Sequence, residues 1–185
     1  MNVNKKKFLL EEGITYLNHG SFGACPKIVF QDYQNWQARL EKQPVQFFTN
    51  EVYDALKNSR ISLAEFLGCN QDELLFFQNP TTAVSNIIYN LDLEPNDEVL
   101  MTDHEYGALV RAWNAWGKKQ NIHIKYAEIT LPLESKDQFF EDFCKKITSK
   151  TKVIFISHIT SPTGLVFPIQ DIIDFAKQKK ILTIV

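Results

Sequence analysis

The part of the chain after Glu73 alternates short apolar runs with amphipathic stretches, and this alternation restricts the possible folds more than any other feature. Five runs are typical of β-strands: LLFFQ (74–78), EVLMT (98–102), IHIKYAEI (122–129), VIFIS (153–157) and ILTIV (181–185). All but the third are nearly continuous apolar runs, as expected for strands that are buried on both faces of a sheet.

Between these runs, apolar residues recur at helical spacing in four stretches: Thr81–Leu91, Tyr106–Lys119, Gln138–Ile147 and Ile169–Lys179. A regular alternation of strands and helices is typical of an α/β fold with a mostly parallel sheet flanked by helices. Ligands of such sheets bind beyond the carboxyl ends of the strands. The loops that follow the strands are therefore the candidate functional sites.

The first part of the chain, residues 1–68, is predicted to be an extended loop followed by a helical segment. Pro26 suits the start of a helix, and a second helix is predicted from Asn50 to a C-cap at Gly68. Apolar residues follow at helical spacing in the first of these helices: Val29, Tyr33, Trp36 and Leu40. The sequence thus predicts a division into residues 1–68 and 69–185.

Charge and composition give no support to several classes of partner. The formal net charge of −2 favours binding neither to nucleic acid nor to an anionic membrane. No apolar stretch approaches the roughly 20 residues that span a bilayer, and the apolar part of MNVNKKKFLLEEG is too short for a signal peptide. The 3 cysteines form no CxxC pair and no zinc-type spacing with the 4 histidines. We therefore expect free thiols, no metal site and a cytoplasmic protein.

The segment Asn79–Ala83 lies between a predicted strand and a predicted helix. Free N–H groups and the dipole at a helix N-terminus favour an anion such as a phosphate, and the hydroxyls of Thr81 and Thr82 would add donors. Capping of the helix by Thr81 or Thr82, with no ligand, is an alternative that the spacing leaves open.

The segment Asp103–Ala108 follows the predicted strand EVLMT. Tyr106 could stack on a flat cofactor, because an aromatic face offers dispersion and quadrupole complementarity. The alternative is an ordinary helix opening in which Asp103 is the cap and Glu105 interacts with the helix dipole.

Two further loops carry polar groups. The loop His158–Gly164 follows the strand VIFIS and contains Ser161 between turn-forming residues, although it could equally be a polar loop without function. The loop Leu17–Ala24 contains Asn18 and His19 among glycines, which indicates close backbone approach or a simple turn.

Taken together and in this order, the loops resemble those of the class V aminotransferase superfamily, specifically its isopenicillin N epimerase-like branch. The segments that carry the resemblance are TYLNHGSFGACP (15–26), QPVQFF (43–48), FFQNPTTAVSNII (76–88), DHEYGALVRAW (103–113) and SHITSPTGLVFPI (157–169). The resemblance implies a fold type I large domain, present in part over residues 69–185. It also implies a pyridoxal 5'-phosphate cofactor, an amino-acid substrate and a homodimer.

The resemblance also implies roles for individual residues. Thr81 and Thr82 match the loop that holds the phosphate of the cofactor, and Tyr106 matches the residue that stacks on its pyridine ring. Ser161 stands where many members have Asn near the 3-hydroxyl group. Asn18 and His19 match a loop that lines the substrate side of the site. Cysteine desulfurases typically have His in place of Tyr106, which favours the epimerase-like and lyase-like branches.

In this family an Asp that holds the pyridine nitrogen of the cofactor directly follows a strand like 181–185, and the lysine that binds the cofactor covalently lies further along the chain. The resemblance therefore implies a chain truncated before its catalytic lysine, with no catalytic residue of its own and no activity in isolation. The complete enzyme is expected to act on an amino acid through a carbanion at Cα, as an epimerase, a C–S lyase or an aminotransferase. A pseudoenzyme, a cysteine desulfurase-like enzyme and an unrelated α/β binding module are the alternatives.

Overall fold

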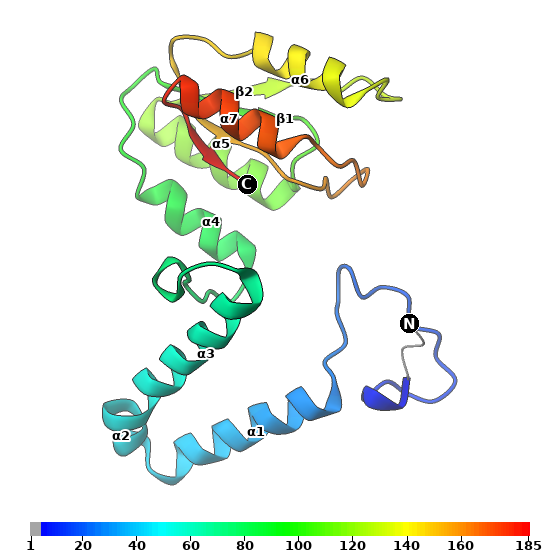
Figure 1. The fold of residues 1–185 in the computed structure, drawn as a ribbon, viewed down its shortest axis with the longest axis vertical. Helices are drawn as coiled ribbons and strands as arrows, with labels where there is room; N and C mark the ends of the chain where they lie inside the picture. Colours follow the sequence, from blue (N-terminus) through cyan, green and yellow to red (C-terminus); the bar gives the residue numbers. More distant parts are fainter. Residues whose placement is uncertain (1–4) are drawn as a thin grey trace. The chain divides into compact units, whose positions relative to one another are not determined.

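The computed structural model describes residues 5–185, and the chain divides into two compact units, Met1–Phe76 and Phe77–Val185. Figure 1 shows the first unit in blue to teal and the second in green to red. The sequence predicts a boundary between residues 68 and 69, whereas the two compact units meet between Phe76 and Phe77. The predicted division into domains stays a prediction.

The second unit is built on a parallel four-stranded sheet. Its strands are β1 (Glu98–Thr102), β2 (His123–Ala127), β3 (Thr151–Phe155) and β4 (Leu182–Ile184), in the order β2-β1-β3-β4. Leu100 pairs with Lys125 on one side and with Ile154 on the other, and every pairing in the sheet is parallel. The predicted α/β fold with a parallel sheet is confirmed.

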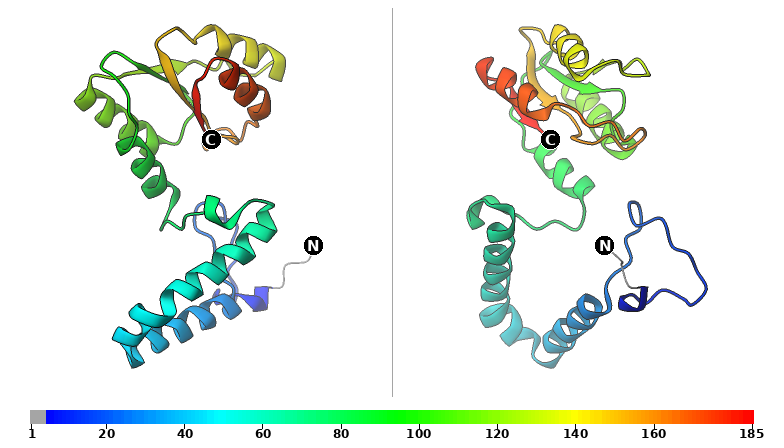
Figure 2. Two further views of the ribbon diagram at one scale, coloured as in Figure 1. Left: turned by 60° about the vertical axis from the view of Figure 1, so that its left-hand side comes forward. Right: turned by 45° about the vertical axis from the view of Figure 1, so that its right-hand side comes forward.

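Four helices cover this sheet: α4 (Pro80–Tyr89), α5 (Gly107–Gln120), α6 (Lys136–Lys145) and α7 (Ile169–Gln178). Figure 2 shows α4 and α5 on one side of the sheet and α6 and α7 on the other. Each predicted helix is confirmed, with shifts of one or two residues at the ends. None of the helices within residues 5–185 is long and apolar enough to cross a membrane.

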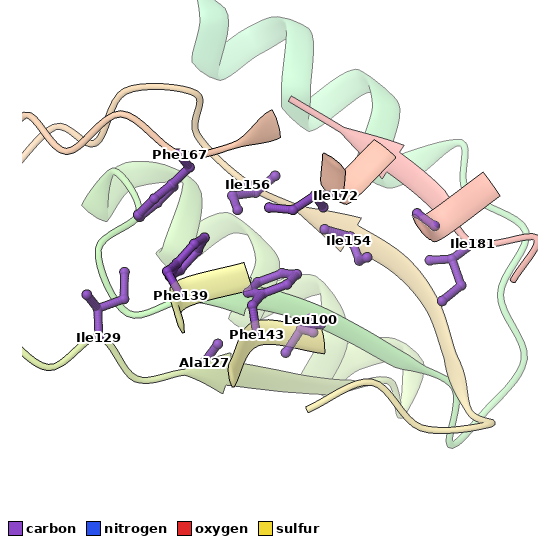
Figure 3. Packing of buried hydrophobic residues seen from close by; sticks show 11 residues of the cluster. Leu100, Ala127, Ile129, Phe139, Phe143, Ile154, Ile156, Phe167, Ile172 and Ile181 are labelled. Carbon is purple, nitrogen blue, oxygen red and sulfur yellow. The ribbon is translucent and has the colours of Figure 1, made fainter. Parts of the chain in front are cut away.

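Successive side chains of a strand point to opposite faces of the sheet. Because helices cover both faces, the central strands β1 and β3 contribute to two separate cores. Leu100 and Ile154 join the α6/α7 core, in which Phe139 stacks on Phe167 with ring centroids 4.3 Å apart (Figure 3). Val99, Met101, Val153 and Phe155 join the α4/α5 core on the opposite face, around the fully buried Trp113. Two-sided burial explains why the segments Val99–Met101 of β1 and Val153–Phe155 of β3 are continuous apolar runs rather than alternating ones.

The prediction of a strand at LLFFQ is wrong. Residues 74–78 follow a short 3-10 turn, Gln71–Glu73, and pair with none of the four strands. Their side chains are largely exposed, with Leu75 at 76% and Phe76 at 50%. Apolar composition meets only half of the requirement for a strand, because the backbone also needs a neighbouring strand for its hydrogen bonds.

The first unit is mainly helical between Lys27 and Leu67, after a largely irregular segment over residues 8–25. α1 (Lys27–Lys42) begins directly after Pro26, and α3 (Val52–Leu67) ends at Gly68. Gly68 has a left-handed φ of 72°, and its N–H bonds to the carbonyl of Ala64, as the predicted C-cap requires. The predicted helix start at Asn50 is two residues early, because α2 (Pro44–Gln46) and a π-helical turn (Phe47–Glu51) precede α3.

A buried carboxylate holds the amino end of the sheet. Glu98, the first residue of β1, forms an ion pair with Lys125 of β2 at 3.0 Å and accepts hydrogen bonds from the hydroxyls of Thr148 (2.5 Å) and Thr151 (3.3 Å). Burial pushes the pKa of Glu98 upward, but the bonds from Thr148 and Lys125, together with the Lys125 charge, outweigh it. The pKa of Glu98 therefore lies below its usual value.

Glu98→Gln should reduce stability in a pH-dependent way. A carboxylate with a lowered pKa stabilises the fold above its ordinary pKa of 4.5, and this contribution is lost as the pH falls through the lowered value. We expect Glu98→Gln to lower the free energy of unfolding at pH 7 by about 1–3 kcal/mol, and to flatten its decline below pH 4.5. Urea titrations at a series of pH values measure both effects. The exposed Glu94→Gln is the control, and equal acid sensitivity of the two variants would contradict the prediction.

Candidate functional site

A buried carboxylate joins the carboxyl ends of β1 and β3. Glu105 is 5% exposed and accepts a hydrogen bond of 2.6 Å from the hydroxyl of Thr102, the last residue of β1. It also accepts bonds from the hydroxyl (2.5 Å) and the N–H (3.1 Å) of Ser157, just beyond β3. The predicted strand VIFIS therefore ends at Phe155 instead of Ser157, because the Ser157 N–H bonds to Glu105 and not to a neighbouring strand.

A second connection lies beside the first. The Nδ1 atom of His104 lies 3.1 Å from the hydroxyl of Thr163, which in turn lies 2.8 Å from the hydroxyl of Thr160. The Thr160 hydroxyl also accepts a bond of 2.9 Å from the N–H of Leu165. The loops Asp103–Ala108 and His158–Gly164 therefore lie side by side at the carboxyl edge of the sheet, as parallel strands require.

The predicted alternative that Asp103 caps the following helix is wrong, whereas the interaction of Glu105 with the helix dipole stays a prediction. Asp103 does not cap α5, because its Oδ1 atom accepts a bond of 3.1 Å from the N–H of Ile129, beyond β2. Glu105 bonds to Ser157 and Thr102 as described above. The N-cap residue of α5 is Tyr106, and its side chain makes no capping bond.

Tyr106 is accessible for stacking. Its side chain is 51% exposed, and its hydroxyl makes no hydrogen bond within residues 5–185. The two residues before it, His104 and Glu105, are both bonded to the neighbouring loop. An exposed aromatic ring on an anchored backbone is suited to stack on a flat ligand.

The N-terminus of α4 is capped by Asn79, so the predicted alternative of a cap by Thr81 or Thr82 is wrong. The Oδ1 atom of Asn79 accepts bonds from the N–H (2.8 Å) and the hydroxyl (3.1 Å) of Thr82. Pro80 has no N–H, and the N–H of Ala83 bonds to the Asn79 carbonyl at 3.2 Å. The N–H and hydroxyl of Thr81 make no hydrogen bond within residues 5–185.

This donor set fits an anion. The unbonded N–H and hydroxyl of Thr81 lie one residue before a donor pair on Thr82 that already binds one oxygen atom, that of Asn79. All four donors lie in the first turn of α4, where the helix dipole favours negative charge. Hydrogen bonds join the loops Asp103–Ala108 and His158–Gly164 to each other, and none within residues 5–185 joins either of them to Thr81 or Thr82.

Ser161 and the N-terminal loop have less defined surroundings. Ser161 is exposed at the turn of the His158–Gly164 loop, and its hydroxyl makes no hydrogen bond within residues 5–185. Asn18 and His19 are exposed in the first unit, where the Asn18 carbonyl accepts from Phe22 at 3.0 Å and the His19 ring contacts Tyr16 edge-on. The N-terminal loop is a turn, and the predicted roles of Asn18, His19 and Ser161 in binding stay predictions.

A parallel sheet with adjoining polar loops at its carboxyl edge is typical of α/β proteins, a class in which ligands bind at that edge. The chain belongs to the aminotransferase class-V family, whose model matches residues 24–185. This family depends on pyridoxal phosphate.

Among its relatives is isopenicillin N epimerase of Amycolatopsis lactamdurans, 29% identical over 184 residues that cover 98% of this chain and 46% of the epimerase. A probable chloroplastic L-cysteine desulfhydrase of Arabidopsis thaliana is 23% identical, covering 88% of this chain and 37% of its own. The chain therefore spans less than half the length of these relatives.

Two solved structures share the fold. A mutant of C-DES with glycine covalently linked to its PLP cofactor gives a TM-score of 0.83 at 21% identity, over 97% of this chain and 47% of that one. The cysteine desulfurase CsdA of Escherichia coli gives 0.78 at 18% identity, over 97% and 46% of the two chains. The similarity confirms the fold type I architecture over about half of those chains.

Thr163→Val should loosen the His158–Gly164 loop, because it removes the hydroxyl that lies between His104 and Thr160. Loss of a hydroxyl with two partners should lower local stability by about 1–2 kcal/mol, so amide exchange of Gly164 and Leu165 should become roughly ten times faster. Hydrogen exchange with mass spectrometry measures this rate. Ser161→Ala, in the same loop but without a bonded hydroxyl, should leave it unchanged; equal rates in both variants would count against the connection.

Proposed function

We propose that this chain is the N-terminal part of a pyridoxal-phosphate-dependent enzyme that acts on an amino acid through a carbanion at Cα. The reaction would be that of an epimerase, a C–S lyase or an aminotransferase. The observation that carries the proposal is the exposed Tyr106 ring on a loop bonded to the His158–Gly164 loop, in a chain that matches the class-V family.

The residues present suit this cofactor. Thr81 and Thr82 would hold the phosphate through the donors at the start of α4, and Tyr106 would stack on the ring. Ser161 would lie near the 3-hydroxyl group, and Asn18 and His19 would line the substrate side. When bound, the cofactor supplies an electron sink for negative charge at Cα of the substrate.

Asn79 has a defined part in this arrangement. Its carboxamide oxygen occupies the donor pair of Thr82 at 2.8 and 3.1 Å. A phosphate oxygen that used the Thr82 donors would share them with Asn79, whereas the N–H and hydroxyl of Thr81 are open to it. Because Asn79 caps α4, the first turn of this helix is formed before the anion binds.

The complete enzyme is proposed to include a lysine that binds the cofactor covalently, outside residues 1–185. The 185-residue chain by itself is proposed to be inactive. The intact protein is proposed to be a cytoplasmic homodimer, and its substrate an amino acid.

A cysteine desulfurase-like enzyme is the second candidate. A cysteine desulfurase, CsdA of Escherichia coli, shares the fold, but so does C-DES, described as a cystine C–S lyase, and the shared fold does not separate the two reactions. Tyr106 favours the epimerase-like and lyase-like branches instead, because cysteine desulfurases typically have His at that position. The products formed from L-cysteine by the complete enzyme, alanine for a desulfurase and pyruvate for a lyase, distinguish the two.

Thr82→Val should weaken cofactor binding in the complete protein. Each charge-assisted hydrogen bond to the phosphate contributes on the order of 1.5–3 kcal/mol, so loss of the hydroxyl should raise the Kd for pyridoxal phosphate about ten- to a hundred-fold. Titration of the cofactor-free protein, followed by absorbance, measures this Kd. Thr82→Ser retains the hydroxyl and should bind nearly as well as the unsubstituted protein. Full affinity of Thr82→Val would remove Thr82 from the phosphate site.

Tyr106→Ala should lower both cofactor affinity and turnover, because it removes the stacking face. An aromatic pair contributes about 0.5–1.5 kcal/mol, so the expected loss of affinity is roughly two- to ten-fold. The Kd for pyridoxal phosphate and the kcat of the complete enzyme measure the two effects. Tyr106→Phe retains the face and should be milder if stacking alone matters. A Phe variant as damaged in kcat as the Ala variant would instead assign a proton-transfer role to the phenol.

A further inference from the structure

We propose that Glu105 is a positioning residue of the cofactor site, and that it places both Tyr106 and the Ser161 loop through its buried carboxylate. This inference rests on the proposed function. The sequence predicts for Glu105 only an interaction with the dipole of the following helix. Its bonds across the sheet edge, to Thr102 and Ser157, point to a different role.

The carboxylate receives three donor groups on two oxygen atoms. Oε1 accepts from the Thr102 hydroxyl at 2.6 Å, and Oε2 accepts from the Ser157 hydroxyl at 2.5 Å. The N–H of Ser157 lies 3.2 Å from Oε1 and 3.1 Å from Oε2, so it is shared by both. No cationic side chain within residues 5–185 pairs with this carboxylate, and the three neutral donors alone offset its burial.

These bonds determine where both loops begin. The N–H of Ile156 still bonds to the carbonyl of Ile184 in β4 at 3.0 Å, as in a continuing strand. The next N–H, that of Ser157, turns to Glu105 instead, so the sheet pairing ends and the loop that contains Ser161 starts. On the other side, Thr102 ties Glu105 to the last position of β1.

Tyr106 depends on the same carboxylate through the backbone. Glu105 is bonded to Ser157, and the preceding His104 is bonded to Thr163, so two consecutive residues are attached to the facing loop. Tyr106 follows them with its ring 51% exposed. A binding side chain needs a supporting shell of bonded neighbours to hold its geometry, and Glu105 supplies that shell here.

The donor groups around this position match a carboxylate. Three donors face the side chain, and a carboxylate offers only acceptors to them. Glu105→Gln would replace one acceptor oxygen by an NH₂ group, so a hydroxyl that now donates to Glu105 would have to accept instead and direct its proton elsewhere. Asp would be one methylene too short to reach both Thr102 and Ser157 from the same backbone position.

The test compares Glu105→Gln and Ser157→Ala with Glu128→Gln, in the complete protein prepared without cofactor. Glu128 is an exposed carboxylate one residue after β2, at the same edge of the sheet, and is the matched control. Two quantities are measured with pyridoxal phosphate: its Kd, and the visible circular dichroism of the bound cofactor at saturation. The second reports ring orientation, which a loss of overall stability does not change at saturation.

We expect Glu105→Gln to raise the Kd on the order of tenfold or more and to change the dichroism of the bound cofactor. Ser157→Ala, which keeps the carboxylate and one of the two Ser157 bonds, should act in the same direction with about a two- to five-fold effect. Glu128→Gln should change neither quantity. Hydrogen exchange without cofactor should be faster at Ser157 in Glu105→Gln than in Glu128→Gln.

A Glu105→Gln protein that melts earlier but keeps the Kd and dichroism of the unsubstituted protein would overturn the inference, since Glu105 would then only stabilise the fold. If Glu105→Gln does not fold, an unchanged Kd and dichroism in Ser157→Ala overturns it equally. Failure of the unsubstituted complete protein to bind pyridoxal phosphate would instead reject the proposed function, and the inference with it.

Discussion

Two-sided burial of β1 and β3 is the constraint on which the rest of the second unit depends. Their alternate side chains enter two separate cores, one under α4 and α5 and one under α6 and α7. Burying each large apolar side chain contributes about 1.5–3 kcal/mol, and both faces must be covered for the strands to be stable. Parallel pairing is what lets helices reach both faces, because each crossover returns the chain over the sheet.

Parallel pairing also gathers the ends of the strands, and the candidate site is a consequence. β1 and β3 both end at the same edge, so the polar residues that follow them meet there. A buried carboxylate joins neighbouring segments at each of the two edges of the sheet. Glu98 joins β1 to β2 and to the segment before β3 at the amino edge, and Glu105 joins β1 to the segment after β3 at the carboxyl edge. The first carboxylate has a lysine partner, whereas the second is bonded only by neutral donors.

The wrong predictions concern groups whose hydrogen-bond partners the sequence pattern did not identify. Composition predicts a strand at LLFFQ, yet no strand of the sheet pairs with it. Thr81 and Thr82 are plausible caps by type, but Asn79 takes that role because it precedes Pro80 in extended backbone, with its side chain toward Thr82. The sequence signal for that cap is present, since Asn before Pro at a helix start is a typical capping pattern. Asp103 bonds to Ile129, which no local pattern indicates.

The sequence by itself determined the α/β class, the helices and the loops in which a site could lie, and it predicted the four strands of the sheet together with a fifth, LLFFQ, that pairs with none of them. Those features depend on periodicity and turn chemistry within short windows, which are local properties. Only the tertiary structure decided that Glu105 bonds to Ser157, 52 residues away, and that His104 lies against Thr163, 59 residues away. The pairing of two polar residues at such separations follows from the register of β1 against β3, and a register is a property of the packed sheet and not of either strand.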